Sequence, residues 1–155
     1  SGPSLTTKMT ILGNGNVGIG ITEPAYVLDV QSDSLKVNSK NGYLTNGADY
    51  AEYFESEGFI GHGAVVGIDL STGKVRVYQE GDELVGIASN PKTAGFIGNG
   101  NRAIEKNAAY TLVALVGQLE FDRAMVEITG RTVKTTDGKK IGVLLSNGKV
   151  FINRS

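Results

Sequence analysis

Apolar residues along this chain fall into short runs that are separated by glycine, asparagine and aspartate. No run shows the period of about 3.6 residues that marks an amphipathic helix. Short apolar runs, spaced roughly 8–12 residues apart with turn residues between them, are typical of a small β-barrel or β-sandwich. The pattern therefore predicts an all-β fold.

The N-terminal part of the chain predicts an extended β-ribbon arm. Val17, Ile19 and Ile21 alternate with small residues, which indicates a strand with one bare side. Glycine inside a strand marks the close approach of another backbone, and the arm has few large apolar residues for a core. We expect residues 4–45 to wind with identical chains as a trimer; the alternative is an edge ribbon packed on the main domain. The expected strands lie at 9–12, 17–22, 27–30 and 35–37.

Residues 46–155 carry enough apolar side chains to form a core of their own. The most apolar stretch, residues 108–121, predicts a central strand that is buried on both faces. A hairpin is expected around Gly73, and two more at Asp137-Gly138 and Asn147-Gly148. Residues 1–3 are read as a remnant of tag removal and are left out of the fold.

Composition excludes several kinds of chemistry. Fifteen basic and sixteen acidic residues give a net charge of −1, which argues against binding along a nucleic-acid backbone. The chain has no cysteine and one histidine, so disulfides, thiolate chemistry and multi-histidine metal sites are excluded; His62 is read as a loop residue. No apolar run approaches the ~20 residues of a membrane span. We expect no cofactor, no metal, no nucleic-acid partner and no membrane insertion.

The stretch "TNGADYAEYFESE" at residues 45–57 concentrates carboxylates and aromatic rings. Self-cleavage of a peptide bond needs a nucleophile, a proton acceptor and a proton donor for the leaving amine. Asp49 and Glu52 are the candidates for the acid and base roles. In a strand they would face opposite sides, and a neighbouring chain of a trimer would have to bring the second carboxylate. In a helical turn they would share one side.

Asn46-Gly47 offers a second route to cleavage, because Gly47 has no side chain to hinder attack by the amide of Asn46. Ring closure at the same Asn-Gly pair more often deamidates the asparagine. A structural explanation competes with both routes. Asn-Gly is a turn signal, Asp49 is suited to an Asx-turn or cap, and Glu52 is suited to a solvated strand edge that discourages strand addition.

Two parts of the chain resemble known families. "GNGNVGIGITEPAYVLDV" resembles a repeat found before the C-terminal domains of phage tail fibres and large bacterial surface proteins. "NGADYAEYFES", followed by "VVGIDLSTGKV", "VGIASNP" and "VALVGQ", resembles the C-terminal intramolecular-chaperone autocleavage domain of phage appendage proteins, the Peptidase G2 type. The resemblance implies a homotrimer that is cut near the Gly-Ala-Asp motif. Asn46 stands where the resemblance leads us to expect a small hydroxyl residue.

From these observations we expect a C-terminal assembly domain of a phage tail fibre or appendage. It would drive homotrimerisation, act as an intramolecular chaperone for upstream fibre domains of the same chain, and cut itself once near Asn46-Gly47. Asn46, Asp49 and Glu52 are the expected catalytic residues. The expected location is the virion, or the bacterial cell surface for a fibre-like surface protein. The alternative is a non-cleaving tip domain whose partner is a host surface receptor.

Overall fold

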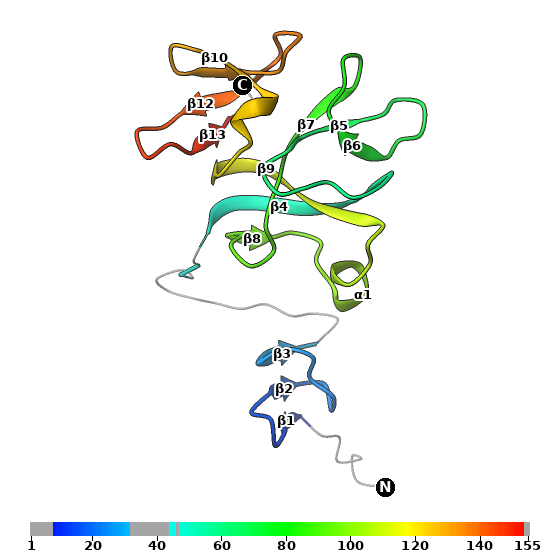
Figure 1. The fold of residues 1–155 in the computed structure, drawn as a ribbon. Helices are drawn as coiled ribbons and strands as arrows, with labels where there is room; N and C mark the ends of the chain where they lie inside the picture. The colour runs from blue at the N-terminus through cyan, green and yellow to red at the C-terminus, as the bar shows by residue number, and fades with distance from the viewer. Residues whose placement is uncertain (1–7, 32–43, 46, 154–155) are drawn as a thin grey trace, which may run out of the picture. The chain divides into compact units, whose positions relative to one another are not determined.

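The computed structural model describes residues 8–31, 44–45 and 47–153 (Figure 1). The chain divides into two compact units, residues 1–43 and 44–155. Asn46 and the strand predicted at 35–37 lie outside the described residues. Almost all regular structure in the described part of the chain is β-strand, so the predicted all-β class is confirmed.

The first unit contains a three-stranded sheet with β2 in the middle. Its strands are β1 (Met9–Ile11), β2 (Val17–Ile19) and β3 (Leu28–Val30). β1 runs antiparallel and β3 parallel to β2. Strands are thus present within three of the stretches where the sequence predicts them.

The two faces of this small sheet differ sharply. On one face Gly18 and Asp29 are buried, and a Cβ on Gly18 would lie only 2.6 Å from the carbonyl oxygen of Ile21. The other face is apolar and open. Its large exposed side chains are Met9, Ile11, Ile19 and Leu28, which are between 44% and 68% exposed.

The second unit contains one ten-stranded sheet in the order β10-β11-β12-β13-β9-β7-β5-β6, with β4 also paired to β9 and β8 paired to β4. The strands are β4 (Ala48–Glu55), β5 (Val65–Ile68), β6 (Val75–Val77), β7 (Glu83–Ala88), β8 (Phe96–Ile97), β9 (Tyr110–Leu119), β10 (Glu127–Thr129), β11 (Thr132–Lys134), β12 (Lys140–Leu144) and β13 (Val150–Ile152). One short helix, α1 (Arg102–Glu105), and one 3₁₀ turn (Arg123–Met125) complete the described elements. No helix in this described part has the length and hydropathy to cross a bilayer.

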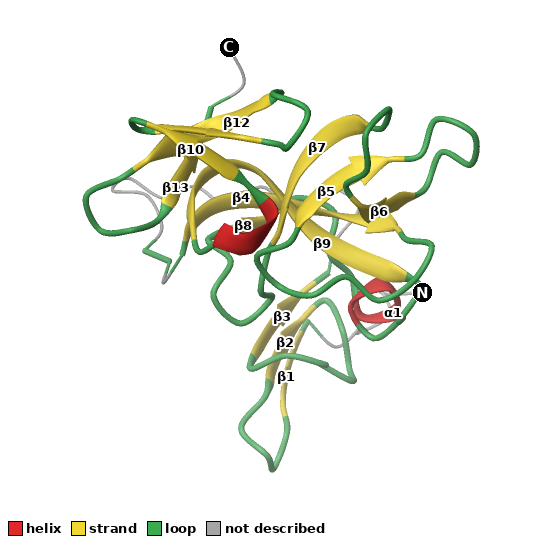
Figure 2. Ribbon diagram, turned by 45° about the horizontal axis from the view of Figure 1, so that its top comes forward, coloured by secondary structure: helices red, strands yellow, loops and turns green. Residues whose placement is uncertain are grey.

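The sheet forks at β9. One edge of β9 pairs with β4 along nearly its whole length. The other edge is shared, because β7 pairs at Val113 and Ala114 whereas β13 pairs at residues 117–119. Two lobes, β5–β7 and β10–β13, therefore diverge from one long strand, and Figures 1 and 2 show them apart in both views.

The prediction of a central strand at 108–121 is confirmed by β9, but its burial on both faces is only partly correct. Leu112, Val113 and Ala114 are all buried, as expected for a strand covered on both sides. Farther along, the strand is covered on one side only, and Val116 is 46% exposed. The hairpin predictions are confirmed, since Gly73, Gly138 and Gly148 lie at turns with φ between 72° and 89°.

Hydrogen bonds connect the two lobes across the fork. Lys139 Nζ in the turn before β12 donates to the backbone oxygen of Asp82 at 2.6 Å, and Tyr78 donates its hydroxyl to Asp137 at 2.8 Å. The Asp82 carboxylate is 2% exposed and accepts from the Arg76 guanidinium at 2.7 and 3.1 Å. The hydrogen bond from Arg76 lowers the pKa of Asp82 below its ordinary value.

This lowered pKa predicts a specific dependence of stability on acid. Because the folded-state pKa of Asp82 lies below the unfolded one, its contribution is present above the ordinary aspartate range and is lost as pH falls through the folded-state pKa, below about pH 4. Asp82→Asn should lower the free energy of unfolding at pH 7 by about 2 kcal/mol and flatten its decline in acid. Urea denaturation between pH 7 and pH 3 measures both. The exposed Glu80→Gln is the control, and an unchanged acid slope in Asp82→Asn would contradict the assignment.

Candidate functional site

Strand β4 carries the acidic aromatic motif and fixes which way its side chains point. Asp49, Ala51 and Tyr53 are buried on one face, while Tyr50 and Glu52 are half-buried on the other. Of the two local conformations that the sequence allowed, the strand is therefore the one present. Asp49 and Glu52 point to opposite faces, so one chain does not bring the two carboxylates together.

Asp49 is 5% exposed, and its carboxylate is held by the segment that follows β7. Ser89 donates its hydroxyl to Oδ2 of Asp49 at 2.6 Å, and the Gly95 amide donates to Oδ1 at 2.9 Å. Both carboxylate oxygens thus accept a hydrogen bond from a residue far away in the sequence, and the buried charge is compensated.

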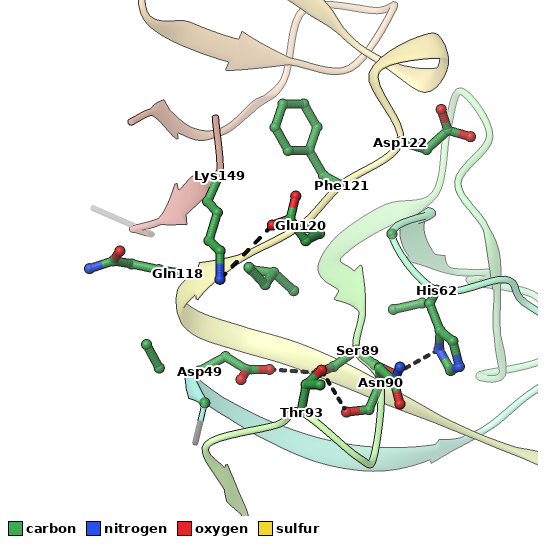
Figure 3. A pocket seen from close by; sticks show the side chains of 15 residues that line it. Asp49, His62, Ser89, Asn90, Thr93, Gln118, Glu120, Phe121, Asp122 and Lys149 are labelled. Atoms are coloured by element: carbon green, nitrogen blue, oxygen red, sulfur yellow. Dashed lines mark hydrogen bonds and ion pairs between the residues drawn. The ribbon is translucent and has the colours of Figure 1, made fainter. Parts of the chain in front are cut away.

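His62 lies on the other side of Ser89 (Figure 3). Its Nδ1 is 3.0 Å from the carbonyl oxygen of Ser89, and because a carbonyl only accepts, Nδ1 carries the hydrogen. The cluster of Asp49, Ser89 and His62 is not a Ser-His-Asp triad, since the histidine contacts the backbone of the serine rather than its hydroxyl.

These residues border a cavity of ≈ 590 Å³ in the fork of the sheet. One side is formed by the start of β4 and the end of β7, and the opposite side by the end of β9 and the residues after it, as Figure 3 shows. Lys149 reaches the cavity from the β12–β13 turn, with its Nζ 4.0 Å from a carboxylate oxygen of Glu120. The residues that line the cavity and are labelled in Figure 3 are Asp49, His62, Ser89, Asn90, Thr93, Gln118, Glu120, Phe121, Asp122 and Lys149.

Three backbone segments meet at the start of β4 with no side chains between them. A Cβ on Gly47 would lie 2.1 Å from the carbonyl oxygen of Thr93, and a Cβ on Gly95 would lie 2.6 Å from that of Gly47. Gly117, at φ +114°, would place a Cβ 2.1 Å from the carbonyl oxygen of Ala48. Only glycine permits backbones to approach this closely. The contact holds the backbone of Gly47 at the edge of the cavity that Asp49 also lines.

Glu52 belongs to a different environment on the outer face of β4. Tyr50 donates its hydroxyl to Glu52 at 2.6 Å and stacks on Phe96 with ring centroids 6.0 Å apart. The hydrogen bond to Glu52, with a smaller contribution from burial, raises the pKa of Tyr50. Phe96 is 63% exposed and Val116, opposite Tyr50 on β9, is 46% exposed. Glu52 is thus surrounded by a partly apolar, open surface.

Sequence reasoning placed Asp49 and Glu52 in this region but missed the residues that hold Asp49. Ser89 lies in the quoted stretch "VGIASNP", to which no role was given, and Gly95 lies in a loop rich in glycine and asparagine. His62, interpreted as a loop residue, borders the same cavity. Asn46 lies outside the described residues. Among those described, no group of three or more histidine, aspartate or glutamate side chains is placed to hold a metal ion.

The fold and the site define an all-β domain in which a buried carboxylate lies beside a backbone segment that glycines confine. The family model for Peptidase_G2, described as the IMC autoproteolytic cleavage domain, matches residues 6–111. The chain belongs to this family. No match was found among curated proteins.

Two solved structures resemble the chain. The first is the pre-mature bacteriophage phi29 gene product 12, with a TM-score of 0.55 and 18% identity over 79% of this chain. The second is the C-terminal fragment of the same phage protein, with a TM-score of 0.47 and 16% identity over 69% of this chain. This chain covers 24% of the first structure and 100% of the second. The similarity to the pre-mature gene product 12 supports the fold described above.

The glycine contacts predict that a single methyl group disrupts the site. Gly47→Ala and Gly95→Ala should each lower the free energy of unfolding by about 3 kcal/mol, because the new Cβ meets backbone atoms that have no free rotamer to move away. Gly58→Ala is the control, since nothing lies within 4 Å of a Cβ there. Urea unfolding followed by circular dichroism measures all three. Equal stability of Gly47→Ala and Gly58→Ala would contradict the packing.

Proposed function

We propose that this chain is the C-terminal assembly domain of a phage appendage and that it cuts its own backbone between Asn46 and Gly47. The observation that carries the proposal is the position of Asp49. Its carboxylate lies in the family's motif, borders the cavity and follows the confined Gly47 by two residues. A fixed carboxylate beside a confined peptide segment is suited to general base chemistry on that segment.

The proposed reaction is a hydrolysis in which Asp49 is the proton acceptor. Asp49 takes a proton from a water molecule whose oxygen adds to the carbonyl carbon of Asn46. The bond from that carbon to the nitrogen of Gly47 then breaks, and the proton passes to the leaving amine. The products are a carboxylate at Asn46 and an ammonium group at Gly47. Attack by the side-chain amide of Asn46 is the second route to a break at the same bond.

The first test replaces the proton acceptor. Asp49→Asn keeps the shape and an acceptor oxygen but cannot take the proton, so the first-order cleavage rate should fall by about 100-fold or more. Glu55→Gln, at the exposed end of the same strand, should leave the rate unchanged. Intact-mass spectrometry over time follows the precursor and two fragments whose masses sum to the precursor plus one water.

The same series is made in an Asn46→Ser parent, which introduces the hydroxyl side chain that the family resemblance leads us to expect at this position. Cleavage in Asp49→Asn at the parent's rate would remove Asp49 from the mechanism. A single stable mass from both parents would refute self-cleavage altogether.

The second part of the proposal is association as a homotrimer that assists folding of upstream fibre domains. The apolar face of the β1–β3 sheet supports it, because four large side chains there are exposed and isolated strands of this length need further burial for stability. Three copies that share one core would bury this face. Pairing strands from separate chains is slow, so a domain that aligns three chains would favour correct assembly.

Glu52 enters this proposal only through association. Its carboxylate lies on the face of β4 opposite Asp49, beside the exposed rings and apolar side chains around Phe96. We propose that a neighbouring copy packs on this surface and that Glu52 acts at the neighbour's site rather than at its own.

A charge on the apolar face should weaken association. Ile11 is 68% exposed on that face, at the end of the outer strand β1, and Ile11→Lys would bury an unpaired ammonium in the trimer, which costs several kcal/mol. Sedimentation velocity at micromolar concentration should show a trimer for the parent and a shift toward monomer for Ile11→Lys. Thr22→Lys, in an exposed bend of the same unit, is the control. A monomeric parent would refute this part of the proposal.

The proposed location is the virion, as part of a tail appendage. The family assignment and the fold shared with the phage protein support it, and neither supports the alternative of a bacterial surface. The expected partners are two further copies of the chain and the upstream domains of the fibre. A non-cleaving tip domain that binds a host receptor remains the alternative prediction, and no observation on the described residues favours it.

A further inference from the structure

We propose that Ser89 is a positioning residue for cleavage, whose hydroxyl fixes the Asp49 carboxylate in the cavity beside Gly47. The inference deepens the proposed self-cleavage and rests on it. It assigns a role to the stretch "VGIASNP", which sequence reasoning connected to the family without giving it a function.

The argument begins with the direction of the two hydrogen bonds to Asp49. Both donors, the Ser89 hydroxyl at 2.6 Å and the Gly95 amide at 2.9 Å, belong to the segment after β7, and neither belongs to β4. Hydrogen bonds to an ionised carboxylate at such distances are short and strong. Strand β4 therefore brings Asp49 to the cavity, whereas residues 89–95 determine how its carboxylate is oriented.

Ser89 is itself held in place from two sides. Its amide donates to the carbonyl oxygen of Leu112 at 2.8 Å, and its carbonyl accepts from Nδ1 of His62 at 3.0 Å. Because the backbone of Ser89 is fixed at both groups and the residue is 6% exposed, its hydroxyl is limited to few orientations. A group of this kind is suited to hold a reactive carboxylate within the narrow range that catalysis requires.

The same segment also confines Gly47, whose nitrogen belongs to the bond proposed for cleavage. The carbonyl of Asn90 accepts from the amides of Thr93 and Ala94 at 2.9 and 2.8 Å, and this turn leads the chain back to Gly95. Gly95 donates its amide to Asp49 and also lies against the carbonyl of Gly47. Orienting the carboxylate and confining the peptide thus depend on one short segment, as effective positioning of reacting groups demands.

A buried serine–aspartate pair also occurs for structural reasons alone, so the test needs a readout that stability does not move. The chain supplies a matched pair: Ser71 donates its hydroxyl to Asp69, also at 2.6 Å, in an exposed turn. Ser71→Ala removes the same kind of hydrogen bond far from the cavity lining. It controls for the general loss of one such bond.

The experiment measures the first-order cleavage rate and the melting temperature of Ser89→Ala, Ser89→Thr and Ser71→Ala, together with Asp49→Asn. Ser89→Ala should cut at least about tenfold more slowly because the carboxylate loses its orienting donor. Ser89→Thr keeps the hydroxyl at a position that lines the cavity, so its rate should stay within about threefold of the parent. Ser71→Ala should cut at the parent's rate.

The outcomes separate this inference from the proposed function. If the parent cuts, Asp49→Asn does not, and Ser89→Ala cuts at the parent's rate, Ser89 has no positioning role while self-cleavage stands. An equal loss of cleavage rate in Ser89→Ala and Ser89→Thr also overturns the role, because the hydroxyl that threonine keeps would then have no effect on the rate. If neither parent cuts, self-cleavage fails and the role of Ser89 fails with it. Should Ser89→Ala melt below the assay temperature, Ser89→Cys replaces it, because a thiol is only a weak donor and predicts the same slowing.

Discussion

The contact between glycine backbones at the start of β4 is the constraint on which the candidate site depends. Gly47, Gly95 and Gly117 come from three segments that are far apart in the sequence, and each would place a Cβ within 2.6 Å of a backbone oxygen of another segment. Backbone packing this close leaves little freedom for small displacements. The position of the chain beside the cavity therefore depends on the absence of side chains at these three residues.

The fork of the sheet turns this contact into a site. Because β7 and β13 share one edge of β9, two lobes diverge and leave a cavity where β4 begins. A polar group at such a place needs partners, and Asp49 receives them from the segment after β7. The lobes are in turn connected by the hydrogen bond from Lys139 to Asp82. This bond lies away from the cavity but holds together the two lobes that border it.

The sequence predicted the β class, the central strand and the hairpins because these follow from local signals. Gly73 and Gly148 lie where turn chemistry requires a left-handed residue. Opposite faces for Asp49 and Glu52 were expected only for a strand, one of two conformations that the sequence left open, and β4 is that strand. The partners of Asp49 were not predictable in this way. Ser89 is forty residues away along the chain, and nothing in its neighbours indicates that the end of β7 meets the start of β4. Gly95, in a glycine-rich loop, carries no mark that distinguishes it from the unconstrained Gly58.

In the proposed mechanism, the orientation of Asp49 and the confinement of Gly47 restrict cleavage to the bond between Asn46 and Gly47. The most direct measurement is the identity of the new amino terminus, determined by mass spectrometric sequencing of the C-terminal fragment. The account predicts a single fragment that begins with Gly47-Ala48-Asp49. A fragment that begins at any other residue, or a mixture of neighbouring starts, would contradict a site defined by the glycine contacts around β4.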